Sequence, residues 1–153
     1  MRLKGKKCIV TGGSSGIGKA TVKRFIAEGA EVLIADIDIK ESKKLAGEIG
    51  DGVHFIKCDV RLENDIISVS KKAYSIWKKV DVLVNNAGSE LNQSYDKMTE
   101  QEWDKVLDTD LKGPWLMCKH IVPKMVETGS GSVINISSLC LLYTSPSPRD
   151  RLK

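Results

Sequence analysis

Short apolar runs alternate with amphipathic stretches along the chain, and this alternation predicts the fold. The runs that read as buried strands are Lys7–Val10, Glu31–Ala35, Val53–Cys58, Val80–Val84 and Ser132–Ile136. Segments with the helical spacing of apolar residues lie between them. Strands that alternate with helices are joined by right-handed crossovers and form a parallel sheet that is covered on both faces. The pattern therefore predicts an α/β domain with a doubly wound parallel sheet.

The longest helical stretch runs from about Glu100 to Glu127. Thr99 and Glu102 have the spacing of a capping box, so we expect the helix to begin there. Pro114 lies within the stretch and should bend it.

A glycine-rich turn, Thr-Gly-Gly-Ser-Ser-Gly-Ile-Gly over residues 11–18, connects the first strand to the first helix. The N–H groups at a helix N-terminus are unpaired and carry partial positive charge, so a pyrophosphate can bind there. We expect Gly12 to allow the tight turn, Gly16 to let phosphates approach the backbone, and Gly18 to let helix and strand pack closely. The candidate cofactor-binding residues here are Gly12, Ser14, Ser15, Gly16, Ile17 and Gly18. Taken alone, such a turn is as compatible with an ordinary connection as with a nucleotide site.

Asp36 follows the second predicted strand, about 20 residues beyond the glycines, where an acid can accept hydrogen bonds from both hydroxyls of an adenosine ribose. The alternative is that Asp36 caps the helix that follows Asp38. The order of strand, glycine turn, helix, strand and acid favours the ribose role.

Composition excludes several other classes of function. The 153 residues suit one domain, and 24 Lys+Arg against 20 Asp+Glu give a net charge of only +4, with the bases scattered rather than clustered as a nucleic-acid surface would have them. No apolar run approaches the length of a membrane span, and no signal peptide is apparent, so we expect a cytoplasmic protein with no membrane partner. The cysteines have neither zinc-site spacing nor disulfide density, and Cys8, Cys58 and Cys118 read as small buried hydrophobic residues.

Further motifs follow the later strands, and together they resemble those of the short-chain dehydrogenases/reductases. The matching segments, in family order, are Thr11–Gly18, Asp59-Val60, Asn85–Gly88 and Asn135–Ser138, and the resemblance covers Lys4 to about Leu139. It implies a Rossmann-type fold that is incomplete at its C-terminal side. It also implies that Asp59 meets the edge of the adenine, Val60 its face, and Asn86, Ala87 and Gly88 the nicotinamide-side ribose, with Ile136 also at the cofactor. Asn85–Gly88 alone is also compatible with a simple strand-ending turn in αL geometry.

The resemblance implies NAD as the cofactor. Members of this family that use NADP carry a Lys or Arg beside the glycine motif or after the second strand, whereas this chain has Ser15, Asp36 and Ile37 there. A 2′-phosphate beside Asp36 would be repelled.

In the chemistry of this family a Tyr, whose pKa a Lys lowers, exchanges a proton with the substrate oxygen, a Ser binds that oxygen, and an Asn anchors a proton relay. Ser138 matches the Ser, and the position of the Asn is occupied by Asp110. This departure affects the relay, because an ionised Asp accepts hydrogen bonds but cannot donate them.

The family places Tyr-x-x-x-Lys about 13 residues beyond the Ser, and this chain has no such motif there. Tyr143 is too close to Ser138, is followed four residues later by Ser147, and lies beside prolines that oppose a helix. Residues 140–150 can be back-translated without mismatch to the transposon-end and adapter DNA of a common sequencing library. We therefore expect residues 1–139 to be the dinucleotide-binding portion and residues 140–153 to be a non-native, disordered tail.

The leading functional hypothesis is an NAD-dependent oxidoreductase that acts on a small alcohol or ketone, whose full-length form is a homodimer or homotetramer and whose present fragment is inactive. The alternative is a non-catalytic dinucleotide-binding module. A sugar-nucleotide epimerase of the extended family is disfavoured, because that group spaces its glycines differently from residues 11–18.

Overall fold

The computed structural model describes residues 1–91 and 93–137. The strands are β1 (Lys7–Thr11), β2 (Glu31–Asp36), β3 (Val53–Lys57), β4 (Val82–Asn85) and β5 (Ser132–Asn135). The helices are α1 (Gly16–Ala27), α2 (Ile39–Ile49), α3 (Glu63–Trp77), α4 (Glu100–Leu107) and α5 (Gly113–Glu127), with a 3-10 turn at Tyr95–Lys97. Over these residues the chain forms a five-stranded sheet in the order β3-β2-β1-β4-β5, in which all paired strands are parallel. The predicted doubly wound α/β fold is thus confirmed, and the strand boundaries differ from the predicted ones by one or two residues.

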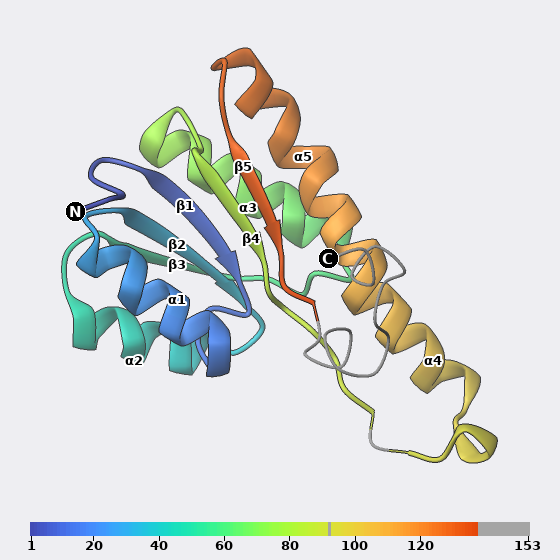
Figure 1. Cartoon of the computed structure of the whole chain (residues 1–153). Helices are drawn as coiled ribbons and strands as arrows, with labels where there is room; N and C mark the ends of the chain where they lie inside the picture. The colour runs from blue at the N-terminus through green and yellow to red at the C-terminus, as the bar shows by residue number, and fades with distance from the viewer. Residues whose placement is uncertain (92, 138–153) are drawn as a thin grey trace, which may run out of the picture.

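The sheet is covered by helices on both faces: α1 and α2 lie on one face, and α3 and α5 on the other (Figure 1). Alternate residues of β1, β2, β3 and β4 pack into the two layers, as the period of a strand requires. In the aligned rows, Ile9, Leu33 and Leu83 pack with α3 and α5, and their neighbours Val10 and Ile34 pack with α1 and α2. All five are fully buried, so the central strands read as continuous apolar runs.

Two cysteines belong to these layers as the sequence predicts. Cys8 and Cys58 are 0% and 2% exposed, and burial raises the pKa of each thiol to about 12. Both therefore stay neutral at physiological pH and act as small apolar side chains. Cys118 is only partly buried, at the edge of the layer that contains α3 and α5.

The long helix predicted over Glu100–Glu127 is interrupted. It begins with the predicted capping box, in which Thr99 and Glu102 each bind the other's backbone N–H. A π-helical segment, Asp108–Lys112, then separates α4 from α5. Pro114 explains why the irregular segment lies here. Proline has no N–H, so it cannot donate to the carbonyl of Asp110 four residues earlier. The irregularity expected at Pro114 therefore lies in the turn before it, as a π-helical segment.

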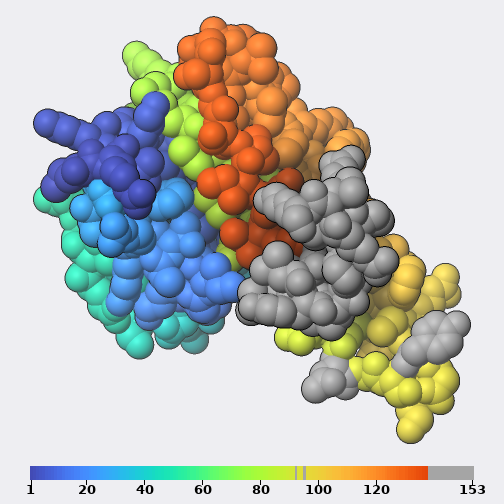
Figure 2. Space-filling view, in the orientation of Figure 1, coloured from blue at the N-terminus to red at the C-terminus, as the bar shows by residue number. Residues whose placement is uncertain are grey.

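β5 forms one edge of the sheet, where it pairs with β4. Its side chains are poorly covered over the described residues: Val133 and Ile134 are 40% and 42% exposed. Figure 2 shows β5, in red, at the molecular surface beside the orange α5. Among the helices that the structure describes, none has the length and apolar character needed to cross a membrane.

Candidate functional site

The sequence motifs follow strands whose carboxyl ends meet at one edge of the sheet. The glycine loop follows β1, Asp36 ends β2, Asp59 follows β3, and Asn86 follows β4. The helix that follows β1, α1, covers one face of the sheet and leads to β2 on one side of β1. The helix α5, which precedes β5, covers the opposite face, and β5 lies on the far side of β4. The direction in which strands are added therefore reverses between the neighbouring strands β1 and β4. Ligands of open parallel sheets bind at such a switch point, beyond the carboxyl ends of the strands.

Two glycines give the loop after β1 its shape. Gly12 has a φ of +62°, which L side chains rarely adopt, and a Cβ there would lie 2.9 Å from the Cα of Ala87. A Cβ on Gly18 would lie 2.1 Å from the carbonyl oxygen of Gly12, so α1 packs against the loop as closely as the sequence predicts. Both glycines are therefore required by the fold.

Gly16 differs from these two, because its surroundings are open. Its φ is +49°, and a Cβ there would meet nothing within 4 Å. Ser15, the N-cap residue of α1, makes no side-chain cap hydrogen bond, and Ser15 and Ile17 are both exposed. The start of α1 thus presents uncapped backbone N–H groups beside an open glycine, which is the arrangement that a pyrophosphate requires.

The loop after β4 is tied to the glycine loop by hydrogen bonds. The side-chain nitrogen of Asn86 donates to the carbonyl oxygens of Thr11 at 2.9 Å and Gly12 at 3.0 Å. The hydroxyl oxygen of Thr11 accepts from the backbone N–H groups of Asn86 and Ala87, each at 3.0 Å. None of residues 85–88 has a positive φ, so the αL turn considered as an alternative is not what forms here. Asn86 and Ala87 hold the two loops together, and Gly88 is exposed beside them.

Asp36 is the buried acid of the site, with 7% of its surface exposed. Its Oδ2 accepts from the backbone N–H of Ser14 at 2.9 Å and from the Ser14 hydroxyl at 2.7 Å, and its Oδ1 accepts from the N–H of Asp38 at 2.9 Å. The N-cap of α2 is Asp38 itself, which binds the N–H groups of Lys40 and Glu41. Asp36 is therefore not the residue that caps α2. Ile37, beside it, is 59% exposed.

Asp59 is bound by a residue that the sequence did not identify, Arg61. The guanidinium Nη2 lies 2.6 Å from Oδ2 of Asp59 and Nε lies 2.9 Å from Oδ1, and the Arg61 N–H also donates to Oδ1 at 3.0 Å. This side-chain hydrogen bonding holds the pKa of Asp59 below its ordinary value. The only signal in the sequence was the two-residue spacing of opposite charges.

Val60 packs closely against Gly113, where an added Cβ would lie 3.0 Å from a methyl group of Val60. The Val60 residue is 6% exposed, so little of its side chain is open to an adenine.

Asp110 lies in the π-helical segment, close to the loop after β4. Its Oδ1 accepts from the N–H of Ser89 at 2.8 Å. An acceptor oxygen is all that this bond requires, so Asp serves here as Asn would. Ser138 lies outside the described residues, and Ile136, at the end of β5, is 40% exposed.

The buried Asn85, the last residue of β4, connects this strand to β5. Its Nδ2 donates to Oδ1 of Asn135 at 2.8 Å, and its own Oδ1 has no partner among the described residues. This pair fixes the carboxyl ends of β4 and β5 relative to each other. No group of three or more His, Cys, Asp or Glu side chains within the described ranges could hold a metal ion.

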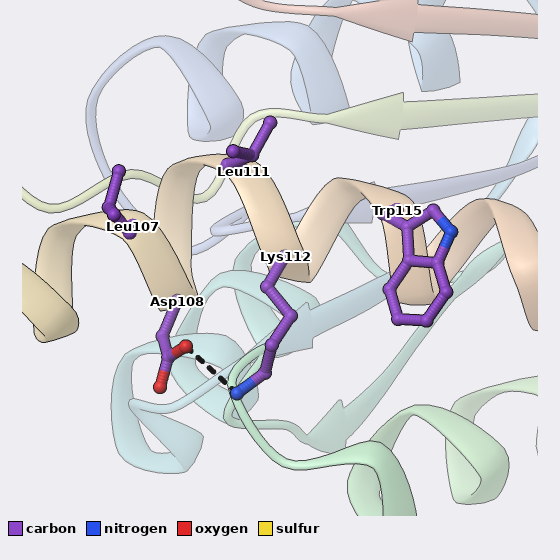
Figure 3. Close-up of a pocket in the computed structure, with 5 residues that line it drawn as sticks. All are labelled: Leu107, Asp108, Leu111, Lys112 and Trp115. Atoms are coloured by element: carbon purple, nitrogen blue, oxygen red, sulfur yellow. Dashed lines mark hydrogen bonds and ion pairs between the residues drawn. The ribbon is translucent and has the colours of Figure 1, made fainter.

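The residues present fit a dinucleotide. Open N–H groups at the start of α1, a buried carboxylate at the end of β2 and a polar group after β3 occur in the order in which pyrophosphate, ribose and base would meet them. A hollow of about 360 Å³ lies elsewhere, on the α4–α5 side, lined by Leu107, Asp108, Leu111, Lys112 and Trp115 (Figure 3). It contains none of the motif residues.

Comparisons with known proteins agree with this geometry. A family model described as short chain dehydrogenase matches residues 6–147. The chain is 37% identical over 153 residues to the 3-oxoacyl-(acyl-carrier-protein) reductase FabG of Thermotoga maritima, covering 95% of this chain and 61% of that protein. It is 36% identical over 148 residues to a probable galactose dehydrogenase GalD of Rhizobium meliloti, covering 94% and 58%. The chain therefore spans about three fifths of the length of these two curated relatives.

Solved structures give the same result. A short-chain dehydrogenase from Streptomyces avermitilis matches with a TM-score of 0.83 and 33% identity, over 90% of this chain and 51% of that one. A metagenomic short-chain oxidoreductase in complex with NADP matches with a TM-score of 0.85 and 31% identity, over 91% and 65%.

Proposed function

This chain belongs to the short-chain dehydrogenase family, and we propose that it forms the NAD-binding part of an oxidoreductase that interconverts a secondary alcohol and a ketone. The observation that carries the proposal is the buried carboxylate of Asp36, held beside an uncapped helix N-terminus at the carboxyl edge of the sheet.

Each part of the cofactor has a binding group in this chain. The N–H groups at the start of α1 bind the pyrophosphate, with Gly16 leaving it room, and Asp36 accepts from the adenosine ribose. Asp59 accepts from the edge of the adenine, and the backbone at Ala87 and Gly88 lies against the nicotinamide-side ribose. When bound, the nicotinamide supplies the hydride acceptor or donor.

The preference for NAD follows from charge. A 2′-phosphate would bring negative charge against the buried Asp36, and its neighbours Ser15 and Ile37 supply no cation to offset it. The NADP in the metagenomic relative is a property of that protein. Here we expect NAD to bind more tightly than NADP by about 1–3 kcal/mol, which is roughly 5- to 150-fold.

Two residues of this chain act near the reacting atoms in the proposed enzyme. Ser138 binds the substrate oxygen, as its match to the family motif implies. Asp110 lies next to the loop after β4 and fixes Ser89, so its role is to position the backbone beside the nicotinamide end of the cofactor. The proton-transferring Tyr-x-x-x-Lys of the family has no match in this chain, so we expect the 153-residue chain to bind cofactor without turnover.

We further propose that residues 140–153 are translated adapter DNA rather than native sequence. The match to the family model extends to residue 147, so the two interpretations compete over the same residues. Resequencing the source locus decides between them: a genomic frame that continues past residue 139 into a Tyr-x-x-x-Lys supports the adapter origin, and genomic DNA that encodes the present residues contradicts it.

Calorimetric titration with NAD and NADP tests the cofactor proposal. The wild-type chain should bind NAD with the stated preference, and Asp36→Ala should remove most of that preference. Asp38→Ala is the matched control, because it removes an acid two residues away that caps α2 and should keep the preference. Equal affinity for the two cofactors in the wild type, or no binding of either, would contradict the proposal.

A second copy of this chain is the partner that we propose for the α4–α5 side. Four large apolar residues repeat every fourth position along it, Trp103, Leu107, Leu111 and Trp115, and they are 39–68% exposed. Residues spaced in this way share one face of a helix. Leu107, Leu111 and Trp115 of this row line the hollow in Figure 3, beside the charged Asp108 and Lys112. Exposed apolar residues that gather along one helix face, rather than singly, are typical of an interaction site.

A further inference from the structure

Ser14 and Asp36, 22 residues apart in the sequence, form a buried contact across the cofactor site. The Ser14 hydroxyl and backbone N–H both donate to Oδ2 of Asp36, at 2.7 and 2.9 Å. The two residues are 4% and 7% exposed, so little water competes for these bonds. The contact joins the glycine loop after β1 to the end of β2.

These bonds occupy most of the carboxylate. A carboxylate has about four acceptor positions, two on each oxygen. Ser14 fills both positions on Oδ2, and the N–H of Asp38 fills one on Oδ1. One position stays open, on Oδ1, so Asp36 as it stands can accept from one ribose hydroxyl rather than from both, which the sequence predicted. The direction of that further hydrogen bond is fixed before any ligand arrives.

We propose that Ser14 is a specificity-determining residue, which positions the carboxylate of Asp36 to accept a ribose hydroxyl and to repel a 2′-phosphate. The inference rests on the proposed NAD-binding function and names a residue that sets its selectivity. Ser14 acts through Asp36, so it is a positioning residue toward the cofactor.

The selectivity for NAD depends on a fixed Asp36 carboxylate, because a mobile carboxylate could turn away from the 2′-phosphate of NADP. With Oδ2 held by two donors from one residue, Asp36 cannot withdraw from a phosphate without breaking buried hydrogen bonds. Without the Ser14 hydroxyl, the backbone N–H alone holds Oδ2 and the side chain gains freedom. NAD then loses a prearranged acceptor, and NADP meets less repulsion.

The test is the ratio of NAD to NADP affinity, measured by calorimetry on the intact chain. Ser14→Ala should lower the ratio about tenfold, and Ser14→Thr, which keeps the hydroxyl, should keep the ratio closer to that of the wild type. Ser68→Ala is the matched control, because its hydroxyl donates to the Asn64 carbonyl on the surface of α3 and its loss should leave the ratio unchanged. If Ser14→Ala does not fold, as judged by circular dichroism, Ser14→Cys removes the hydroxyl while keeping the side-chain size.

The outcomes separate the two proposals. A wild-type chain that prefers NAD, together with Ser14 variants that keep the full preference, overturns the role of Ser14 and leaves the proposed function intact. A wild-type chain that binds neither dinucleotide overturns the proposed function, and the selectivity role of Ser14 with it. A general loss of affinity with an unchanged ratio marks Ser14 as merely structural and also overturns the inference.

Discussion

The side-chain nitrogen of Asn86 donates to the carbonyl oxygen of Gly12 at 3.0 Å, and this bond joins the loop after β4 to the glycine loop. A Cβ on Gly18 would lie 2.5 Å from the same nitrogen and 2.1 Å from the same oxygen. The first turn of α1 therefore packs onto a hydrogen bond, so α1, the loop after β1 and the loop after β4 meet at one point. This contact holds the proposed cofactor site in shape without a ligand.

Gly18→Ala should therefore destabilise the fold by about 3 kcal/mol, because the added methyl must displace backbone atoms of Gly12. Urea unfolding followed by circular dichroism measures this change. Gly47→Ala is the control: Gly47 lies in α2 with open space at its Cβ position, so alanine should stabilise the chain by about 0.5–1 kcal/mol. Similar effects of the two substitutions would show that the close approach at Gly18 carries no energetic weight.

The sheet could be predicted from the sequence because its central strands are buried on both faces and read as apolar runs, as at Ile9 and Leu33. The motif residues could be placed because the carboxyl ends of parallel strands share an edge. The roles of Gly12 and Gly18 were predicted from the glycine spacing alone, and the structure gives both the tight turn and the close packing.

Contacts between side chains could not be predicted from the sequence. Nothing in the pattern indicated that Ser14 reaches Asp36 or that Arg61 folds back onto Asp59, because these contacts depend on loop paths rather than on periodicity. The π-helical segment was missed for a different reason. Pro114 signals an irregular helix, but hydrophobic spacing does not tell a kink from a wider turn, so one continuous helix was predicted.

Arg61→Gln should weaken the fold in a way that depends on pH. The hydrogen bonds from Arg61 lower the pKa of Asp59, so they contribute stability above the ordinary carboxyl pKa of about 3.9, and that contribution is lost as pH falls through the lower pKa of the folded state. Because Arg61 is 35% exposed, solvent screens the pair, and we expect a loss of about 0.5–1 kcal/mol at pH 7.

Unfolding curves of both proteins at pH 7, 5 and 3 measure this dependence. The difference between wild type and Arg61→Gln should be full at pH 7 and 5 and should shrink at pH 3 and below. A difference that is constant with pH would mean that Arg61 stabilises through packing rather than through the charge of Asp59.

Asp110→Asn should leave the free energy of unfolding nearly unchanged, because the amide oxygen can still accept from the N–H of Ser89. Asp110→Ala removes that acceptor and should cost about 1 kcal/mol. Asp104→Ala, an exposed acid on α4, controls for the change in helix propensity and charge. Hydrogen exchange of the Ser89 amide, measured by NMR, should quicken in Asp110→Ala and not in Asp110→Asn. Equal exchange in all variants would contradict the role of Asp110 as the partner of Ser89.

The apolar row on α4 and α5 leads us to predict that two copies of the chain associate through Leu111 and Trp115. These side chains are 68% and 58% exposed, and Lys119 lies over the ring of Trp115 at 5.4 Å, so a charged side chain covers part of that ring. Burying both residues against a second copy would remove apolar surface from water on each chain, and apolar burial is the main driving force of association.

Leu111→Lys should therefore shift the chain toward the monomer in sedimentation equilibrium, with the dissociation constant of the dimer rising at least tenfold. Ile76→Lys, on the exposed side of α3, replaces an equally large apolar residue away from the row and should not change the association. A wild-type chain that stays monomeric over the whole concentration range would contradict this assignment, and so would an equal effect of the two lysine substitutions.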